Sequence, residues 1–178
     1  MTKNEIHQLF LSFRSRYRSS GRPVRVNFRK LVPELNGCDR FTHLIHAYPA
    51  KLLNIIPYFF FQTEDFCPNN GLVLDPFCGT GTVLLEANLS GRNALGADAN
   101  PLARLITAVK TTYIPHDRLL KEIDALVENA KKSKSKLTWK TEIIDYWFSQ
   151  NVISQLEKIR VAIDGVKKTS DRNFFLLC

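Results

Sequence analysis

Two acidic residues and two glycines stand at regular spacing in the middle of the chain. Asp75 ends a short apolar run, and Gly79 and Gly81 follow it in a loop that leads into a helical pattern. Glycines open backbone conformations closed to other residues, and a helix N-terminus presents N–H groups and partial positive charge to a ligand. Asp98 follows Asp75 by about 20 residues, the offset that a strand-helix-strand unit gives to a ribose-binding carboxylate. These residue types predict a site for a nucleotide-type ligand.

The segments around these residues predict the elements that position them. Residues 71–74 predict a buried strand, and residues 93–98 predict a second short strand. Residues 82–90 carry a helical pattern that Gly91 ends, and Pro101 opens a further helix over residues 102–111. This order implies two adjacent parallel strands joined by a crossover helix. The sequence therefore predicts an α/β fold.

Three kinds of glycine loop compete for this pattern. The phosphate loop of nucleoside triphosphatases needs Lys and then Ser or Thr after its last glycine, whereas Thr82 and Val83 follow Gly81. The dinucleotide fingerprint needs a third glycine at position 84, which is Leu84. The remaining ligand is S-adenosylmethionine, which has no phosphate to bind.

S-adenosylmethionine offers an amine, two ribose hydroxyls and an adenine to such a loop. Asp75 would face the methionine amine, directly or through water, and Asp98 would accept hydrogen bonds from the ribose hydroxyls. Phe77 would pack against the ligand. The structural alternatives are a helix N-cap for Asp98, before Pro101, and a core aromatic for Phe77. Cys78 is best explained as a small filler of the loop, because nothing nearby would activate it as a nucleophile.

The composition limits the classes of protein to which the chain can belong. The 178 residues suffice for one domain, and 44% hydrophobic with 24% charged residues is ordinary for a globular chain. No apolar run reaches the roughly 18 residues of a membrane span, and no signal-peptide pattern opens the chain. Four widely spaced cysteines fit a reducing cytoplasm, without zinc or disulfides. His43 and His46 are spaced for one helix face, but neither a third ligand nor a carboxylate lies at useful spacing, so we expect no metal site.

Positive charge is concentrated at the N-terminus. The first 30 residues hold eight basic residues and one acidic residue, a net charge of +7 in a chain of net charge +8. Arginines with interleaved aromatic residues suit contacts with nucleic-acid phosphates, and we predict such contacts for Arg14, Arg16, Arg18 and Arg22. The alternative is a solvated or partner-facing arm.

The flanking segments predict mainly helices. Helices are expected over residues 4–18, 52–61, 119–130 and 150–166, the second of them buried and kinked or begun again at Pro57. Residues 24–31 predict a strand or an extended arm, residues 33–40 a loop, and residues 131–136 an exposed basic turn. Trp139 and residues 143–148 are apolar and aromatic enough to be buried.

The loop and its surroundings resemble a known family. The string DPFCGTGT at residues 75–82, followed by Glu86-Ala87, Gly91-Arg92 and residues 96–103, is similar to the cofactor motif of DNA amino-methyltransferases. These enzymes methylate the exocyclic amine of adenine or cytosine. Residues 46–51 resemble the segment that precedes that motif and helps enclose the methionine end of the cofactor. The resemblance is close over residues 41–111 and looser at residues 146–148 and 174–177.

This resemblance implies a fold, a cofactor and a substrate. It implies the front half of a Rossmann-like S-adenosylmethionine-dependent methyltransferase domain at residues 41–178, after a basic N-terminal extension at residues 1–40. The substrate would be double-stranded DNA, the setting a restriction-modification system and the location the cytoplasm, with no membrane partner. The implied cofactor-binding residues are Tyr48, Lys51, Asp75, Pro76, Phe77, Gly79, Gly81, Asp98 and Asn100.

One family motif is absent from the sequence. The catalytic Asp/Asn/Ser-Pro-Pro-Tyr/Phe motif would accept hydrogen bonds from the target amine and stack on the flipped base, yet the chain has no consecutive prolines. In the family order it would follow residue 178. We therefore expect the chain alone to be inactive, as a truncated reading frame or as half of a split enzyme whose second chain carries the motif. An RNA base methyltransferase and a non-catalytic nucleic-acid-binding module are the alternatives.

Overall fold

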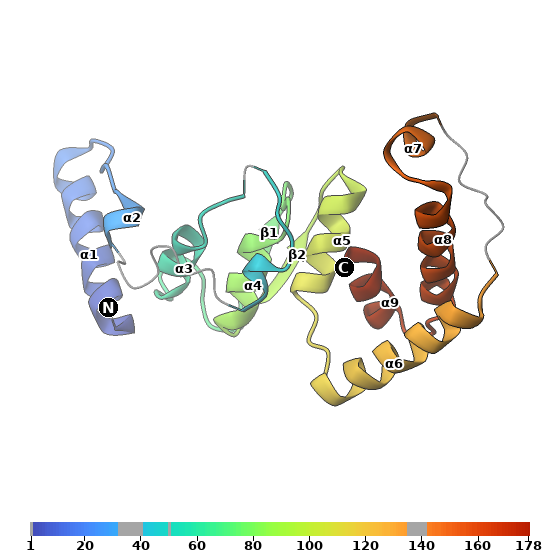
Figure 1. Ribbon diagram of the computed structural model, residues 1–178. Helices are drawn as coiled ribbons and strands as arrows, with labels where there is room; N and C mark the ends of the chain where they lie inside the picture. Colours follow the sequence, from blue (N-terminus) through green and yellow to red (C-terminus); the bar gives the residue numbers. More distant parts are fainter. Residues whose placement is uncertain (1, 32–40, 50, 135–141) are drawn as a thin grey trace. The chain divides into compact units, whose positions relative to one another are not determined.

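The computed structural model describes residues 2–31, 41–49, 51–134 and 142–178. The chain divides into two compact units, Met1–Thr111 and Thr112–Cys178. Figure 1 shows the order of the elements along each unit. The predicted loop at residues 33–40 and the predicted burial of Trp139 lie outside the described residues. The predicted boundary between residues 40 and 41 stays a prediction.

A two-stranded parallel sheet stands at the centre of the first unit. β1 (Leu72–Asp75) pairs with β2 (Asn93–Gly96) in a register that sets Leu74 opposite Leu95. The crossover helix α4 (Thr82–Leu89) packs against both strands, and α5 (Pro101–Lys110) packs against α4 (Figure 1). The predicted α/β fold class and the parallel pairing are confirmed.

The prediction of a buried first strand is wrong. Leu72 and Leu74 of β1 are 64% and 68% exposed, and Leu95 of β2 is 57% exposed. The register places these three leucines on one face of the sheet, while Gly96 on the other face lies against Leu84 of α4. The apolar run predicted the strand correctly, but α4 covers only one of its two faces.

The first unit has its own aromatic core beside the sheet. α1 (Lys3–Ser20) starts with a Thr2–Glu5 capping box and ends at Gly21, whose φ is 63°. Its apolar face packs on α3 (Ile55–Phe61) and on the one-turn helix α2 (Phe28–Leu31). Asn27 caps this turn by accepting from the Lys30 N–H, so residues 28–31 of the strand or extended arm predicted at residues 24–31 form a helical turn instead.

α3 corrects the predicted helix over residues 52–61 at its start. Leu52 and Leu53 precede it and are 42% and 39% exposed. Pro57 lies in the first turn, where the missing N–H costs no helical hydrogen bond, so the helix begins once and needs no kink. Four of its seven residues are buried, among them Phe59 and Phe61.

The regular elements among the described residues of the second unit are all helices. It contains α6 (His116–Lys132), α7 (Glu142–Trp147), α8 (Gln150–Asp164) and α9 (Thr169–Leu177). α6 packs on α8, and the buried Asp171 of α9 accepts from Arg118 of α6 at 2.9 Å. In the described residues no helix is both long and apolar enough to cross a bilayer.

For this unit, one prediction is wrong and a second is wrong in part. Residues 143–148 were expected to be buried, yet Ile143, Tyr146 and Trp147 are each more than 70% exposed, because α7 is short and turns its apolar side chains outward. Of the exposed basic turn predicted at residues 131–136, Lys131 and Lys132 are exposed but form the last turn of α6, and residues 135–136 lie outside the described residues. Cations in the last turn of a helix interact favourably with the helix dipole.

Candidate cofactor site

The glycine loop between β1 and α4 has the conformation that its sequence predicts. Gly79 and Gly81 have φ values of 50° and 72°, in the left-handed region that favours glycine. Thr107 of α5 donates from Oγ1 to the Gly79 carbonyl oxygen at 2.9 Å. A Cβ atom on Gly81 would lie 2.7 Å from Thr107 Cγ2, so α5 approaches the loop closely enough to exclude a side chain there.

Asp98 reaches back from the end of β2 to this loop. Its Oδ2 accepts from the Gly79 N–H at 2.9 Å and its Oδ1 accepts from the Asn100 N–H at 2.8 Å. The helix N-cap of α5 is Asn100, whose side chain accepts from the Leu102 N–H, so the N-cap alternative for Asp98 is wrong. Each carboxylate oxygen keeps further acceptor capacity, and the side chain is half-buried.

Asp75, Pro76 and Phe77 lie at the open side of the loop. Asp75 Oδ1 accepts from the Phe77 N–H at 3.2 Å, which tightens the turn after β1. The Phe77 ring is 87% exposed, so the alternative of a core aromatic is wrong. A ring at this edge is free to pack on a ligand, although no contact here tests that role.

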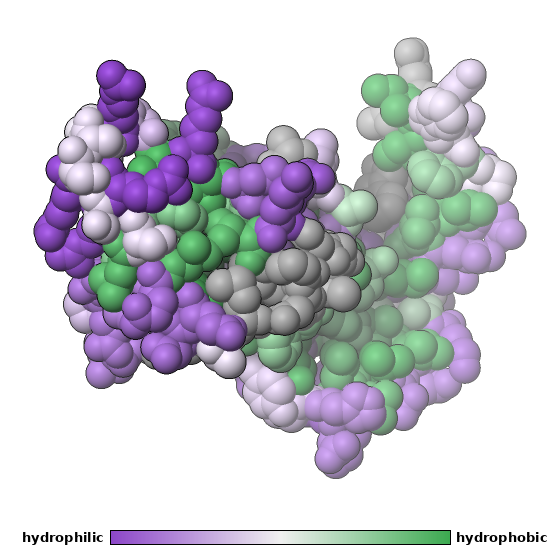
Figure 2. All heavy atoms as spheres, turned by 90° about the vertical axis from the view of Figure 1, so that its left-hand side faces the viewer, coloured by the Kyte–Doolittle hydropathy of each residue, from purple (hydrophilic) through white to green (hydrophobic). Residues whose placement is uncertain are grey.

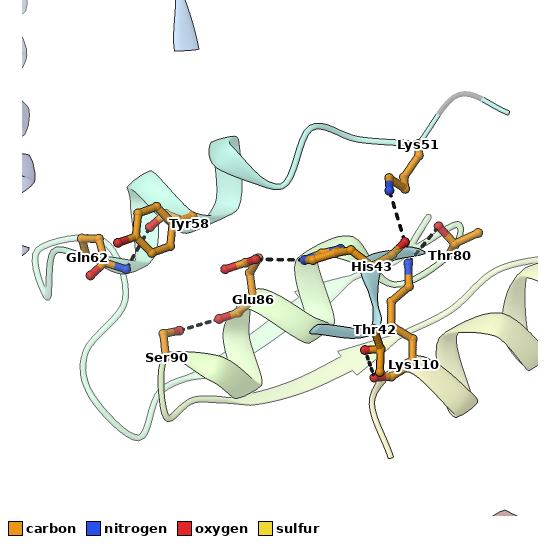
Figure 3. A network of polar contacts seen from close by, with 9 residues as sticks. All are labelled: Thr42, His43, Lys51, Tyr58, Gln62, Thr80, Glu86, Ser90 and Lys110. Carbon is orange, nitrogen blue, oxygen red and sulfur yellow. Dashed lines mark hydrogen bonds and ion pairs between the residues drawn. The ribbon is translucent and has the colours of Figure 1, made fainter. Parts of the chain in front are cut away.

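Tyr48 and Lys51 come to the site from the segment before α3. The Asn100 side chain donates to the Tyr48 hydroxyl at 3.0 Å, so Tyr48, Asn100, Asp98 and Gly79 form one chain of hydrogen bonds. Lys51 donates instead to the His43 carbonyl oxygen at 3.2 Å (Figure 3). Its predicted contact with a cofactor stays a prediction.

A buried histidine-glutamate pair was not predicted. His43 Nε2 donates to Glu86 Oε1 at 2.9 Å, and the two side chains are 0% and 1% exposed. His43 belongs to the one-turn 3-10 helix η2 (Phe41–Leu44), and Glu86 belongs to α4 (Figure 3). The sequence contains no local signal for this pair, because 43 positions separate its members.

The prediction that His43 and His46 share one helix face is wrong. η2 ends before His46, which donates from Nδ1 to the Ala47 carbonyl oxygen at 2.6 Å. In the part of the chain that the structure describes, no three His, Cys, Asp or Glu side chains gather as a metal site would require.

Cys78 fills the base of the loop. Its side chain is buried against Gly96, where a Cβ atom would lie 3.0 Å from the sulfur. Burial raises the pKa of the Cys78 thiol, and the negative charges of Asp75 and Asp98 raise it further, although a hydrogen bond with Thr107 opposes them. The thiol therefore stays protonated near neutral pH, a state unsuited to nucleophilic chemistry.

The four arginines predicted to contact nucleic acid lie in α1 or directly after it. Arg14 and Arg18 line an apolar hollow of about 610 Å³ between α1 and α3, whereas Arg16 and Arg22 do not. Arg14 forms an ion pair with Asp65 at 2.9 Å, which offsets its charge. Figure 2 shows the apolar surface bordered by hydrophilic side chains on the side of the molecule that carries α1. Contacts of these arginines with nucleic-acid phosphates stay a prediction.

Comparisons with known proteins concern the same central elements. A family described as DNA methylase matches residues 63–110, which span β1, the glycine loop, α4, β2 and α5. The Type II methyltransferase M.MvaI of Kocuria varians is 30% identical over 146 residues, which cover 76% of this chain and 32% of that protein. The Type II methyltransferase M.MjaII of Methanocaldococcus jannaschii is 26% identical over 131 residues, covering 58% and 24% respectively.

No solved structure matches the chain significantly. The chain spans about a third of the length of M.MvaI and about a quarter of the length of M.MjaII. The matched residues are those that build the glycine loop and place Asp98 against it. By these matches the chain belongs to the DNA amino-methyltransferase family.

Proposed function

We propose that the first unit binds S-adenosylmethionine as the methyl donor for the exocyclic amine of cytosine or adenine in double-stranded DNA. The main support for this proposal is the position of the Asp98 carboxylate. Two backbone N–H groups hold it at the carboxyl edge of the parallel strands. Parallel α/β sheets bind their ligands at this edge. The names of the two relatives, both Type II methyltransferases, support DNA as substrate and a restriction-modification setting.

Different residues of this edge would bind different parts of the cofactor. Asp98 would accept from the two ribose hydroxyls, since its oxygens are already oriented by Gly79 and Asn100. Asp75 would face the methionine amine at the end of β1, and Tyr48 would close over the ligand from Asn100. Pro76, Phe77, Gly79, Gly81 and Lys51 would complete the enclosure.

The protein's contribution to methyl transfer is then positioning. The bound cofactor supplies a methyl group already activated on a sulfonium. The loop fixes where that group points, because left-handed glycines and the Thr107 contact leave the backbone little freedom. The sequence contains no consecutive prolines, so we propose that the catalytic motif and the pocket for the base come from residues outside it, such as a second chain.

DNA would be bound partly through the N-terminal arginines. Arg16, Arg18 and Arg22 are exposed, and phosphate contacts through them would depend strongly on salt. Arg14 would contribute less, because Asp65 already pairs with it.

Calorimetric titration with S-adenosylmethionine tests the cofactor assignment. Asp98→Ala should weaken binding at least about tenfold, since hydrogen bonds to a charged group are worth about 1.5–3 kcal/mol. Asp124→Ala, which removes an exposed carboxylate from α6, is the matched control and should bind as the wild type does. Equal binding by the wild type and Asp98→Ala would refute the role of Asp98, and a wild type that binds no cofactor would refute the function.

A further inference from the structure

The segment of residues 41–49 is held by side-chain contacts rather than by regular structure. Its only helical element within the described residues is the single turn η2. Thr42 donates from Oγ1 to the Lys110 carbonyl oxygen at 2.7 Å, and Tyr48 accepts from Asn100 at 3.0 Å. Both of these contacts reach α5 or its N-cap, so the segment is tied to the element that follows β2.

The His43–Glu86 pair ties the same segment to the other helix, α4. Figure 3 shows the imidazole of His43 pointing from η2 to the Glu86 carboxylate. Glu86 lies about one helical turn beyond the start of α4 at Thr82, and its neighbours Leu85 and Ala87 are buried. The pair therefore ties residues 41–49 to α4 through a buried contact.

The buried His43–Glu86 pair restricts the position of residues 41–49 more than an apolar contact would. A buried carboxylate is unfavourable unless a partner satisfies it, and an apolar pair of similar size often stabilises a fold as well or better. A histidine-glutamate pair, in contrast, accepts one distance and one direction. Its chemistry thus suits a role in fixing where the segment lies rather than in adding stability.

The hydrogen bonds also define which ring nitrogen of His43 carries the proton. Nδ1 is buried and has no hydrogen-bond partner among the described residues, so a proton there would lack an acceptor. The Nε2–H tautomer satisfies Glu86 and leaves Nδ1 bare. A glutamine at this position could present an N–H to Glu86, whereas a leucine could not.

We propose that His43 and Glu86 are positioning residues that hold Tyr48 over the cofactor edge and so raise affinity for S-adenosylmethionine without touching it. This inference rests on the proposed function. The chain of contacts runs from Glu86 to His43, along the segment to Tyr48, and through Asn100 to Asp98. Loss of the buried pair lets the segment move and removes the Tyr48 contact.

A double-mutant cycle on cofactor affinity tests the proposal. By calorimetry at a temperature where circular dichroism shows each variant folded, His43→Leu should weaken S-adenosylmethionine binding about tenfold, and His43→Gln should restore most of it. In a Tyr48→Phe background, His43→Leu should cost much less, because the contact it positions is already gone. Glu86→Gln, which retains an acceptor, serves as the second variant if His43→Leu does not fold, and should weaken binding less than Glu86→Leu.

The outcomes separate the two proposals. A wild type that binds no cofactor refutes the proposed function. A wild type that binds, with His43→Leu lowering the melting temperature but leaving the dissociation constant unchanged, refutes the positioning role alone. Full additivity of His43→Leu and Tyr48→Phe likewise refutes it, because a structural loss without coupling would affect both backgrounds equally.

Discussion

Two regions of the first unit are stabilised by different forces. The aromatic cluster, built from Ile6, Phe10 and Phe59 with the rings that surround them, buries apolar side chains between α1 and α3. The cofactor edge, residues 75–81 and 96–100, is held by backbone conformation and hydrogen bonds, and its largest apolar side chain, Phe77, is 87% exposed. The aromatic cluster buries its large apolar side chains, whereas the cofactor edge exposes Phe77 and buries only smaller side chains such as Cys78 and Thr80.

This difference assigns stability and binding to separate places. Apolar burial contributes most of the free energy of folding, so the aromatic cluster should control unfolding. The edge contributes little burial, so its residues should control affinity for a ligand with smaller effects on unfolding. Substitutions in each region can test whether that separation holds.

The largest effect should come from Phe59→Ala in the aromatic cluster. Phe59 is 2% exposed and contacts Phe13, Phe28 and Phe60, so its loss leaves a cavity costing about 3–5 kcal/mol of unfolding free energy. Urea unfolding would measure this, and the folded fraction should bind S-adenosylmethionine normally. Leu74→Ala, on the open face of the sheet, is the apolar control and should cost less than about 1 kcal/mol. Similar losses of unfolding free energy for both variants would show that the aromatic cluster does not control stability.

An intermediate effect is expected for Gly81→Ala at the cofactor edge. Its φ of 72° and the 2.7 Å approach of Thr107 Cγ2 together should cost about 3 kcal/mol, and the displaced loop should also lose cofactor affinity. Gly91→Ala is the matched control, because its φ is 77° but nothing lies within 4 Å of a new Cβ. It should cost about 1 kcal/mol and leave affinity unchanged. Equal costs at the two glycines would show that the contact with α5 is not tight.

The conformation of the glycine loop could be predicted from the sequence because its signals are local. The left-handed glycines and the proline at the first position of α5 act within a few residues of their own positions. The parallel pairing of β1 with β2 followed from their order and the helix between them. Asn100 was named as a cofactor-site residue, and capping of α5 was considered only as the alternative role of Asp98, whereas Asn100 is the N-cap.

Features that depend on distant residues could not be predicted in this way. The apolar runs at residues 72–74 and 143–148 predicted burial, but hydrophobicity alone does not say which neighbour covers a face. The His43–Glu86 pair joins segments whose proximity follows only from the packing of η2 on α4. The arginines at residues 14–22 were grouped by sequence, whereas the ion pair that offsets the charge of Arg14 comes from Asp65, 51 positions away.

The smallest effect concerns Cys78, whose thiol is buried at the base of the loop although it belongs to the cofactor edge. Because the folded state raises the pKa of this thiol, folded chains keep its proton when unfolded chains, with an ordinary value of about 8.5, have lost it. The unfolded state then binds fewer protons, so this group's contribution to stability falls as pH rises above about 8.5.

The comparison of wild type with Cys78→Ala isolates that contribution. The other cysteines occur in both proteins and cancel, so the free energy of unfolding of the wild type relative to Cys78→Ala should decline between about pH 8 and pH 10. Alkylation by iodoacetamide at pH 8 should also be slower for Cys78 in the folded chain than in urea, while the exposed Cys178 should show less protection. A difference independent of pH would mean that solvent reaches the thiol, and the base of the loop would then be as open as its rim.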